Sequence, residues 1–444
     1  MENFSWERHN TIKSNFCLQK CNLFRMKKSK KWNLSGFIPW HSFCYISTIV
    51  HLLREEGSGI TLQICSFTAP TKIISGVDAR KTVGTEVKSL GGKVVFISTD
   101  KGIVNAGLLV DILESLSKES LAYVVFDEVE TNPAIDIVEK GLQVYRNEEC
   151  DILLAVGGGS AMDTAKAIGI MVNNPGPIGT YAGIDKYPCA PPDIVSVPTA
   201  AGTGAEILST AVITDPVRNC KISVSGARQS PRVAIVDPLM LQTLPASIAA
   251  ATGMVTLTHA VEGYVSLGSS ELTDLLNFKG IQLAAKYLRR FVANRRDLEA
   301  ATGMQMACLY AALGSSNSGL GNVYAMANSL DGHFNILHGI ACAALLPAVM
   351  QFNTMACPDK FIEIAGCFGE NVSGLPAPEA SLKAAVAVRK LVKDIGLPAG
   401  LRDMEITEEQ IVQMSRDAMG SGISKTNPRE TNLMDMIKLY RESI

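Results

Sequence analysis

The stretch ILLAVGGGSAMDTAK, residues Ile152–Lys166, decides the fold, because an apolar strand pattern runs through three glycines directly into a helix pattern. Gly157, Gly158 and Gly159 allow a tight turn in which no Cβ atom interferes. The unpaired N–H groups at the start of the following helix, with its positive dipole end, attract an anion such as a pyrophosphate. A glycine-rich connection is also ordinary in α/β proteins. This segment alone leaves a phosphate site and a plain turn both open.

Apolar, β-branched runs alternate with helical patterns on both sides of this stretch, from Phe67 to about Pro238. The runs are VVFIST from Val94, AYVVFDEV from Ala122, ILLAV from Ile152, IVSVP from Ile194 and VAIVD from Val233. Each is bounded by Gly, Pro, Asn or Asp, and strands that are buried on both faces are this apolar. The alternation predicts an α/β domain over residues 67–238, built from βαβ units around a parallel sheet.

Beyond Pro238 the β-branched runs fade and long helical patterns take over. They cover residues 273–294, 299–314 and 381–395. Thr407 and Gln410 form the sequence pattern of a capping box ahead of IVQMSRDAM, which marks the start of another helix. We therefore expect an all-α C-terminal domain over residues 239–444.

Residues 1–66 differ in composition from the rest of the chain. They hold all three tryptophans, three of the six histidines, and nine Lys or Arg against four Glu. The basic run Lys27–Lys31 is followed by an apolar stretch, as in a secretory signal, but no clean small-residue cleavage site follows it. We interpret this segment as an atypical leader, either a disordered appendage or the product of a misassigned start codon.

The overall composition, with 47% apolar and 19% charged residues in 444, is typical of a compact soluble protein. Lys and Arg total 41 against 43 Asp and Glu, so no basic excess favours nucleic acid as a partner. The longest nearly apolar stretch, residues 37–53, contains His41 and His51, which argues against a membrane span. The 11 cysteines form no CxxC pair, as expected for reduced thiols in a cytoplasmic protein.

Two further segments bear on the glycine turn. Asp100 follows the first predicted strand, where its carboxylate can accept hydrogen bonds from a ribose diol and repel a 2′-phosphate, which favours NAD over NADP. The same position suits a helix N-cap, and both roles are compatible. The loop PTAAGTGAE, residues 198–206, offers hydroxyls and backbone donors to the same ligand, or is simply a flexible loop.

Taken in order, these motifs resemble the iron-containing (group III) alcohol dehydrogenase family. The motifs are GGGSAMDTAK, PTAAGTGAE, VETNP at 129–133, ATGMVTLTHAVE at 251–262, His338-Gly339 and Asn427-Pro428-Arg429. The resemblance extends from Phe67 to the C-terminus. It implies a dehydroquinate synthase-like architecture, with an α/β dinucleotide-binding domain, an all-α domain and an active site between them. It also implies exchange of hydride between NAD(P) and a small alcohol, aldehyde or ketone, an Fe²⁺ or Zn²⁺ ion, and a possible homo-oligomer.

The resemblance assigns the cofactor residues position by position. The pyrophosphate loop and its following helix correspond to Gly157, Gly158, Gly159, Ser160 and Asp163, and the ribose-selecting carboxylate corresponds to Asp100. The second loop supplies Thr199 and Thr203, and Lys221 matches a lysine near the nicotinamide ribose. Cofactor binding is therefore expected to be intact.

The metal site implied by the same resemblance is incomplete. The family uses Asp and His four residues apart on one helix, where they share a face, and two histidines further on. Here Val255 takes the place of the aspartate before His259, and Tyr324 takes the place of a histidine before His338. Asn328 replaces another histidine, one implicated in proton relay. Only His259 and His338 remain as candidate ligands, fewer than the three that a catalytic site usually has.

Two arrangements could compensate for the missing metal ligands. A rearranged metal site could draw on Glu262, Asp331 or His333. Alternatively, His259, His338, Tyr324 or Lys221 could donate a hydrogen bond to the carbonyl oxygen in place of a cation. We take His259, His338 and Lys221 as the catalytic candidates.

Three functions remain open at this point. The first is an NAD-dependent alcohol dehydrogenase with an altered or absent metal, which the intact cofactor loops favour. The second is a nucleotide-binding protein that no longer catalyses and has a structural or regulatory role, which the incomplete metal site favours. The third, weaker, is a sugar-phosphate enzyme related to dehydroquinate synthase or glycerol-1-phosphate dehydrogenase.

Overall fold

The computed structural model describes residues 64–216, 220–334, 336–398, 400–401 and 404–444. The chain divides into two units, Met1–Ile64 and Cys65–Ile444, and all the described helices and strands belong to the second. The predicted leader, residues 1–66, falls almost entirely outside the described residues.

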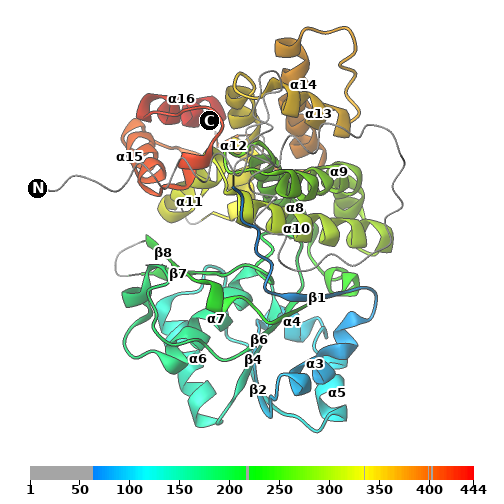
Figure 1. Ribbon diagram of the computed structural model, residues 1–444, viewed down its shortest axis with the longest axis vertical. Helices are drawn as coiled ribbons and strands as arrows, with labels where there is room; N and C mark the ends of the chain where they lie inside the picture. The colour runs from blue at the N-terminus through cyan, green and yellow to red at the C-terminus, as the bar shows by residue number, and fades with distance from the viewer. Residues whose placement is uncertain (1–63, 217–219, 335, 399, 402–403) are drawn as a thin grey trace, which may run out of the picture. The chain divides into compact units, whose positions relative to one another are not determined.

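Six parallel strands form the main sheet, in the order β1-β9-β6-β4-β2-β3. Figure 1 labels β1, β6, β4 and β2 of this sheet. Their bounds are β1 (Lys72–Ser75), β2 (Val94–Ser98), β3 (Ala122–Phe126), β4 (Ile152–Gly157), β6 (Ile194–Pro198) and β9 (Val233–Val236). The five strands expected from the apolar runs are confirmed. Sequence patterning missed β1, an edge strand of four residues with only two partly buried side chains.

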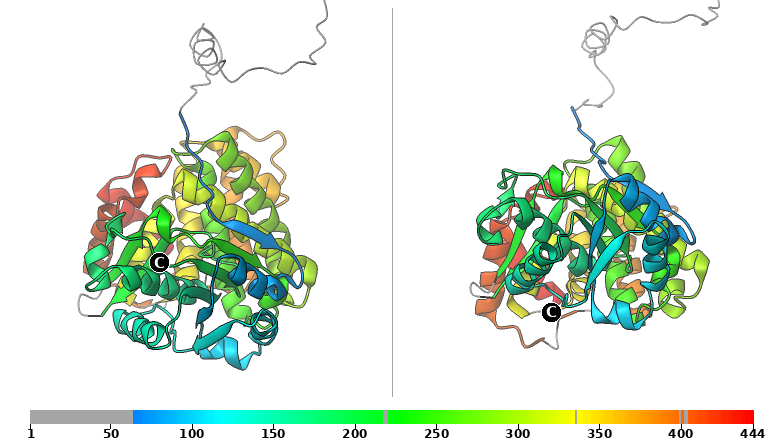
Figure 2. Two further views of the ribbon diagram at one scale, coloured as in Figure 1. Left: turned by 60° about the horizontal axis from the view of Figure 1, so that its bottom comes forward. Right: turned by 90° about the horizontal axis from the view of Figure 1, so that it is seen from below.

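Helices cover both faces of this sheet (Figure 2). They are α3 (Val83–Ser89), α4 (Lys101–Asn105), α5 (Val110–Lys118), α6 (Ile135–Asn147) and α7 (Gly159–Asn173). Alternate strand residues enter two separate cores: Phe96 and Leu153 pack with α6 and α7, whereas Ile97 and Leu154 pack with α3 and α5. Burial on both faces explains why the strands read as continuous apolar runs. The α/β fold class is confirmed.

A second, three-stranded sheet was not predicted. It contains β5 (Gly183–Ile184), β7 (Thr210–Asp215) and β8 (Cys220–Ser225), and β7 pairs with β8 antiparallel. The register places Thr214 opposite Lys221. Short 3-10 turns are η2 (Ala79–Thr82), η3 (Ile178–Tyr181), η4 (Ala227–Gln229), η5 (Pro238–Leu241) and η7 (Ile423–Thr426).

The C-terminal part of the chain is all helix. Its elements are α8 (Ala246–Val265), α9 (Glu271–Ala293), α10 (Leu298–Ser318), α11 (Asn322–Phe334), α12 (His338–Asn353), α13 (Pro358–Cys367), α14 (Ala377–Asp394), α15 (Glu408–Gly420) and α16 (Leu433–Ser443). The predicted helices and the capping box are confirmed: Thr407 Oγ1 accepts from the Gln410 N–H at 3.3 Å, and Gln410 Oε1 accepts from the Thr407 N–H at 2.9 Å. The domain boundary expected at Pro238 lies at the start of η5 and stays a prediction.

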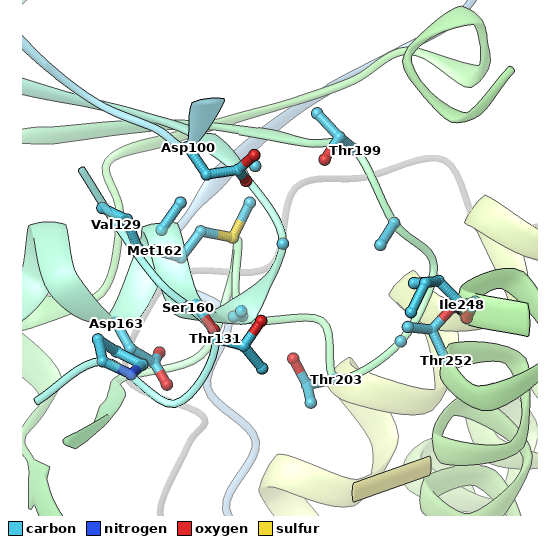
Figure 3. Close-up of a pocket in the computed structure, with 18 of the residues that line it drawn as sticks. Asp100, Val129, Thr131, Ser160, Met162, Asp163, Thr199, Thr203, Ile248 and Thr252 are labelled. Atoms are coloured by element: carbon cyan, nitrogen blue, oxygen red, sulfur yellow. Dashed lines mark hydrogen bonds between the residues drawn. The ribbon is translucent and has the colours of Figure 1, made fainter. Parts of the chain in front are cut away.

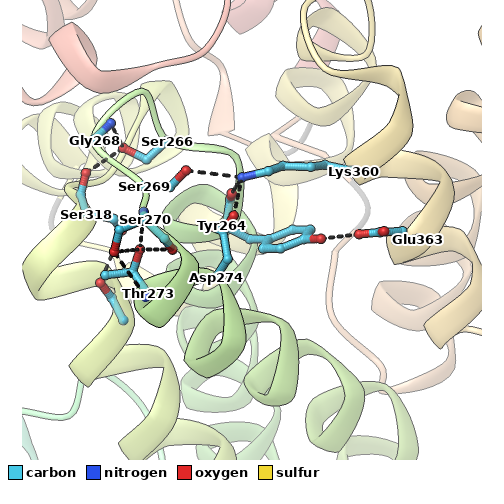
Figure 4. A network of polar contacts seen from close by, with 11 residues as sticks. Tyr264, Ser266, Gly268, Ser269, Ser270, Thr273, Asp274, Ser318, Lys360 and Glu363 are labelled. Carbon is cyan, nitrogen blue, oxygen red and sulfur yellow. Dashed lines mark hydrogen bonds and ion pairs between the residues drawn. The ribbon is translucent and has the colours of Figure 1, made fainter. Parts of the chain in front are cut away.

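Helix α8 is the centre of this part, because from Ala249 to Val265 every residue except Thr252 is buried. Helices α9, α10 and α12 surround it. A polar network joins α13 to the end of α8: the Lys360 ammonium contacts the Tyr264 carbonyl and the Asp274 carboxylate, and Tyr264 donates to Glu363 (Figure 4). Among the described residues, no helix has the length and apolar character that crossing a membrane requires.

Candidate active site

A cleft of about 940 Å³ lies at the carboxyl ends of the central strands. Its floor comes from the loops after β2, β4 and β6, and its opposite wall from α8, α11 and the start of α12. In the sheet, β3 lies on one side of β2, whereas β6 lies on the other side of the neighbouring strand β4. The connections that leave β2 and β4 therefore run in opposite directions, and the strand order reverses between these two strands. Ligands of open α/β sheets bind at such a reversal point.

The glycine turn forms the middle of the cleft floor. A Cβ on Gly157 would lie 2.6 Å from the Cβ of Ala161, so the turn needs a glycine there. Gly158 has no neighbour within 4 Å of its would-be Cβ, and Gly159 has only Thr203 Oγ1, at 3.5 Å. No side chain caps the start of α7. The first N–H groups of this helix are therefore available to an anion in the cleft.

The second predicted loop, residues 198–206, is hydrogen-bonded to α8 and to the glycine turn. Thr256 on α8 donates to the carbonyls of Ala201 and Gly202, at 3.2 and 3.0 Å. Gly204 has a φ of 75°, and a Cβ there would lie 2.2 Å from the Cβ of Ala312. Thr199, on the same loop, donates its N–H to the Gly157 carbonyl at 3.0 Å, which joins the two loops.

Hydroxyl groups gather in front of the glycine turn. Thr131, Thr199 and Thr203 line the cleft, and Figure 3 shows their side chains around the space next to Ser160. Thr131 belongs to the VETNP motif, whose sequence alone does not mark it as a site residue. Ile248 and Thr252, on α8, were also missed, since their helical pattern did not indicate which side chains face the cleft.

Asp100 sits at the N-cap of α4 and at the edge of the cleft. Its Oδ1 accepts from the Ile103 N–H at 2.9 Å, which confirms the capping role. Its Oδ2 lies 4.0 Å from the would-be Cβ of Gly157. The carboxylate therefore caps α4 and also lies next to the glycine turn. The two roles expected of Asp100 are thus compatible in this structure. Contact with a ribose stays a prediction.

Asp163 and Lys166 lie one helical turn apart beneath the cleft. Asp163 accepts from the Val212 N–H at 3.2 Å and lies 3.7 Å from the Lys166 ammonium. Burial raises the pKa of Asp163 to about 6, although Lys166 opposes this. Lys166 is fully buried and donates to the carbonyls of Ala205 and Thr210, at 2.7 and 3.1 Å. It anchors the second loop, a role that the sequence motif did not indicate.

Lys221 and His338 meet at a single carboxylate. The Lys221 ammonium lies 3.1 Å from Asp331 Oδ2, and His338 Nδ1 lies 2.8 Å from the same oxygen. The Asp331 side chain is fully buried. Burial alone would lower the pKa of His338, but Cys342 and Asp331 raise that pKa to about 10. Asp331 thus holds two predicted catalytic residues, a role that sequence reasoning missed.

The remaining predicted residues cluster at one end of the cleft. Val255, Tyr324, Asn328 and His338 line it, whereas His259 is buried and is not among the lining residues. The Tyr324 ring packs on both imidazoles, with centroid distances of 5.1 Å to His259 and 4.9 Å to His338. Neither ring nitrogen of His259 has a hydrogen-bond partner among the described residues. Burial and His338 lower the pKa of His259 to about 3.

The residues around this cluster do not fit a rearranged metal site. Glu262 accepts from the N–H groups of Gly321, Val323 and Tyr324, at 3.0, 2.6 and 3.2 Å, and so holds the start of α11. His333 pairs instead with Asp417, at 2.8 Å. In the part of the chain that the structure describes, no three His, Cys, Asp or Glu side chains are placed to share an ion. Glu262 and His333 are thus held by other partners in this structure, and a metal site rearranged around them stays a prediction.

Comparisons with known proteins agree with this architecture. Residues 70–238 match the family of iron-containing alcohol dehydrogenases, and residues 249–444 match the C-terminal domain of that family. The chain is 38% identical to 1,3-propanediol dehydrogenase of Klebsiella pneumoniae over 386 residues, which cover 86% of this chain and 100% of that protein. It is 35% identical to NAD-dependent methanol dehydrogenase of Bacillus methanolicus over 379 residues, which cover 85% of this chain and 100% of the relative.

A solved crystal structure has a similar fold over most of this chain. The crystal structure of 1,3-propanediol oxidoreductase matches with a TM-score of 0.84 and 38% identity, covering 86% of this chain and 100% of the other. Both halves of the chain, α/β and helical, are therefore accounted for by one family. The chain belongs to the iron-containing alcohol dehydrogenase family and is an enzyme of the alcohol dehydrogenase type.

Proposed function

We propose that this protein is an NAD-dependent oxidoreductase that interconverts a small alcohol and its aldehyde or ketone by hydride transfer. The observation that carries the proposal is the meeting of the glycine turn, Asp100 and Thr203 in one cleft that Lys221 lines from β8 and whose opposite wall holds His338. A dinucleotide laid on the turn would have its reactive end toward that wall. Bound NAD(H) supplies the hydride acceptor or donor.

The cofactor preference rests on Asp100. Its carboxylate adjoins the glycine turn, where a ribose diol can donate to it. A 2′-phosphate at the same place would be repelled by the like charge. The relative named NAD-dependent methanol dehydrogenase supports the same choice.

The chain's own residues would hold and orient the substrate. Thr203 and Ser160 offer donors to the pyrophosphate beside the turn, and Lys221 lines the cleft from β8, across from α11. Asp331 holds Lys221 and His338 in fixed positions, so both can donate to the oxygen of the substrate. No step is assigned to a metal ion, because the residues that line this end of the cleft do not supply the three ligands that such an ion requires.

Titration of the purified protein with NADH and with NADPH tests the cofactor site. We expect NADH to bind and to raise the melting temperature, and NADPH to bind more weakly. Gly158→Leu would place a side chain in the open space of the turn and abolish binding without unfolding the protein. Gly366→Leu, at an exposed site on α13 with open space, is the matched control. Equal binding of NADH to the Gly158 variant would contradict the proposed site.

A scan of NADH oxidation across short aldehydes and ketones, with and without added Fe²⁺ or Zn²⁺, tests the activity. Turnover of at least one carbonyl substrate is the expected result. A protein that binds NADH but reduces none of them under either condition would favour the non-catalytic alternative, which the substituted metal ligands support.

A further inference from the structure

We propose that this chain carries out its hydride transfer without a divalent cation, and that the Tyr324 hydroxyl contacts the carbonyl oxygen where other members would hold the ion. The inference rests on the proposed function and concerns the same cleft. It follows from three features of the described residues, which are the helix face that carries His259, the position of the Tyr324 ring and the commitments of the nearby carboxylates.

The helix face toward the cleft lacks a carboxylate. Val255 lies four residues before His259 on α8, so the two side chains share one face of the helix. Val255 lines the cleft and is 3% exposed, and its methyl groups cannot ligate an ion. This face therefore offers one imidazole.

That imidazole is shielded from the cleft. His259 is 2% exposed and does not line the cleft, whereas Tyr324 does, with its ring packed on His259. A zinc or iron ion must lie about 2.0–2.1 Å from a ligating ring nitrogen. An ion in the cleft would have to displace the Tyr324 ring to reach His259.

The neighbouring carboxylates have other partners. Glu262 accepts three backbone N–H groups at the start of α11, and Asp331 binds Lys221 and His338. Recruiting Glu262 to an ion would leave buried donors without a partner, which is costly. Asp331 Oδ1 is buried without a hydrogen-bond partner among the described residues, but no set of three His, Cys, Asp or Glu side chains in that part of the chain is placed to share an ion. The His338 nitrogen that does not contact Asp331 is Nε2, which is buried without a hydrogen-bond partner among the described residues and belongs to a ring packed edge-on against Tyr324. This end of the cleft lining thus offers an ion one imidazole nitrogen, fewer than the three ligands that a catalytic site usually has.

Tyr324 is placed to act as the electrophile. Its backbone N–H is held by Glu262 at 3.2 Å and its ring packs edge-on against His338, at an interplanar angle of 74°. The side chain is partly exposed to the cleft.

The reduction balances in atoms, charge and electrons with NADH, the Tyr324 hydroxyl and water as reactants. In the reductive direction, the carbonyl carbon receives a hydride, with its two electrons, from the reduced nicotinamide, and the C=O π bond breaks. The oxygen takes a proton from the Tyr324 hydroxyl, and the phenolate regains a proton from water in the open cleft. The products are the alcohol and the oxidised dinucleotide, and one proton from solution is consumed.

The wild-type enzyme provides the first test. It is expressed in medium that contains iron and zinc, its metal content is determined by elemental analysis, and reduction of the aldehyde selected by the scan is followed with and without EDTA. We expect little metal and unchanged turnover in EDTA. Stoichiometric iron or zinc, with activity lost in EDTA and restored by the ion, would overturn the proposal. Absence of turnover with every carbonyl compound and every ion would overturn the proposed function itself.

Variants test the role of Tyr324. Tyr324→Phe keeps the ring packing and removes the hydroxyl, so we expect kcat to fall by a factor of at least about ten while the affinity for NADH is unchanged. Tyr123→Phe, at an exposed position on β3, is the matched control and should leave kcat unchanged. Wild-type kcat in a folded Tyr324→Phe protein would refute the assigned role.

A third test restores metal-ligating side chains at positions 255 and 324. The double variant Val255→Asp with Tyr324→His offers a carboxylate, an imidazole and an accessible His259, and we expect it to take up stoichiometric zinc or iron, measured on the protein without reference to activity. If the double variant folds but gains no metal, then Val255 and Tyr324 are not the residues that exclude the ion.

Discussion

Lys221 and Asp331 join the two walls of the cleft: the ammonium on β8 lies 3.1 Å from a carboxylate on α11 that is 110 residues further along the chain. The carboxylate is fully buried, whereas the lysine side chain is 22% exposed. The same oxygen also contacts His338 Nδ1 at 2.8 Å, so one carboxylate links the sheet side and the helix side at this end of the cleft.

Asp331→Asn should therefore weaken both stability and turnover. The variant leaves Lys221 and His338 without their common counter-charge, and we expect a loss of about 1–3 kcal/mol in the free energy of unfolding, since Lys221 is partly solvated. Urea denaturation and steady-state kinetics measure the two effects. Asp417→Asn, which breaks the more exposed pair with His333, should cost less than about 1 kcal/mol and leave kcat unchanged. Equal effects of the two substitutions would contradict a special role for Asp331.

Gly204→Ala should damage the second loop. The residue has a φ of 75°, and its new Cβ would overlap Ala312, so strain and overpacking add to about 2–4 kcal/mol. Gly396→Ala has the same φ of 75° with no neighbour within 4 Å, and should cost only the backbone term of about 1 kcal/mol. Thermal unfolding of both proteins separates the two contributions. A control as unstable as Gly204→Ala would show that backbone strain, not packing on α10, dominates.

Substitutions of Asp100 can separate its two roles. Asp100→Ser keeps an N-cap oxygen for the Ile103 N–H but removes the charge, so stability should hold while NADPH becomes a usable cofactor. Asp100→Ala removes the cap as well and should cost about 1 kcal/mol. The ratio of kcat/KM for NADH and NADPH, measured beside urea denaturation, reports each role. An unchanged ratio in both variants would exclude Asp100 from cofactor selection.

Glu206 should make stability depend on pH. Burial raises the pKa of this carboxyl from 4.5 to about 7, although Lys166 opposes the shift. Because the folded protein holds this proton more tightly than the unfolded chain, the favourable contribution is complete at pH values below 4.5 and is lost as the pH rises toward 7.

Glu206→Gln removes this titration. Its free energy of unfolding, relative to the wild type, should rise by about 1–3 kcal/mol between pH 5 and pH 8. Denaturation curves at both pH values measure the change. A difference that is independent of pH, or that shrinks as the pH rises, would mean that Glu206 is already ionised in the folded protein.

Local signals accounted for much of the fold. The apolar runs predicted five strands, because a strand that is covered on both faces must be apolar along its whole length. The capping box at Thr407 and the helix cap at Asp100 could be predicted from the sequence, because each involves residues only three positions apart. The glycine turn was readable because its chemistry lies in consecutive residues.

Contacts between distant residues account for what was missed. Glu262 was interpreted as a possible ligand, yet it holds the N–H groups of α11 some 60 residues away. The hairpin of β7 and β8, which brings Lys221 to the cleft, has no long apolar run of its own because one face is only half-buried.

Residue types and their spacing thus predicted the sheet, the glycine turn and the family, since each is a property of short segments. Long-range packing established that Tyr324 shields His259 and that Asp331 binds both Lys221 and His338. The physical reason is that a buried charge takes whichever partner the folded chain places within hydrogen-bond distance, and that partner is not encoded by nearness along the chain.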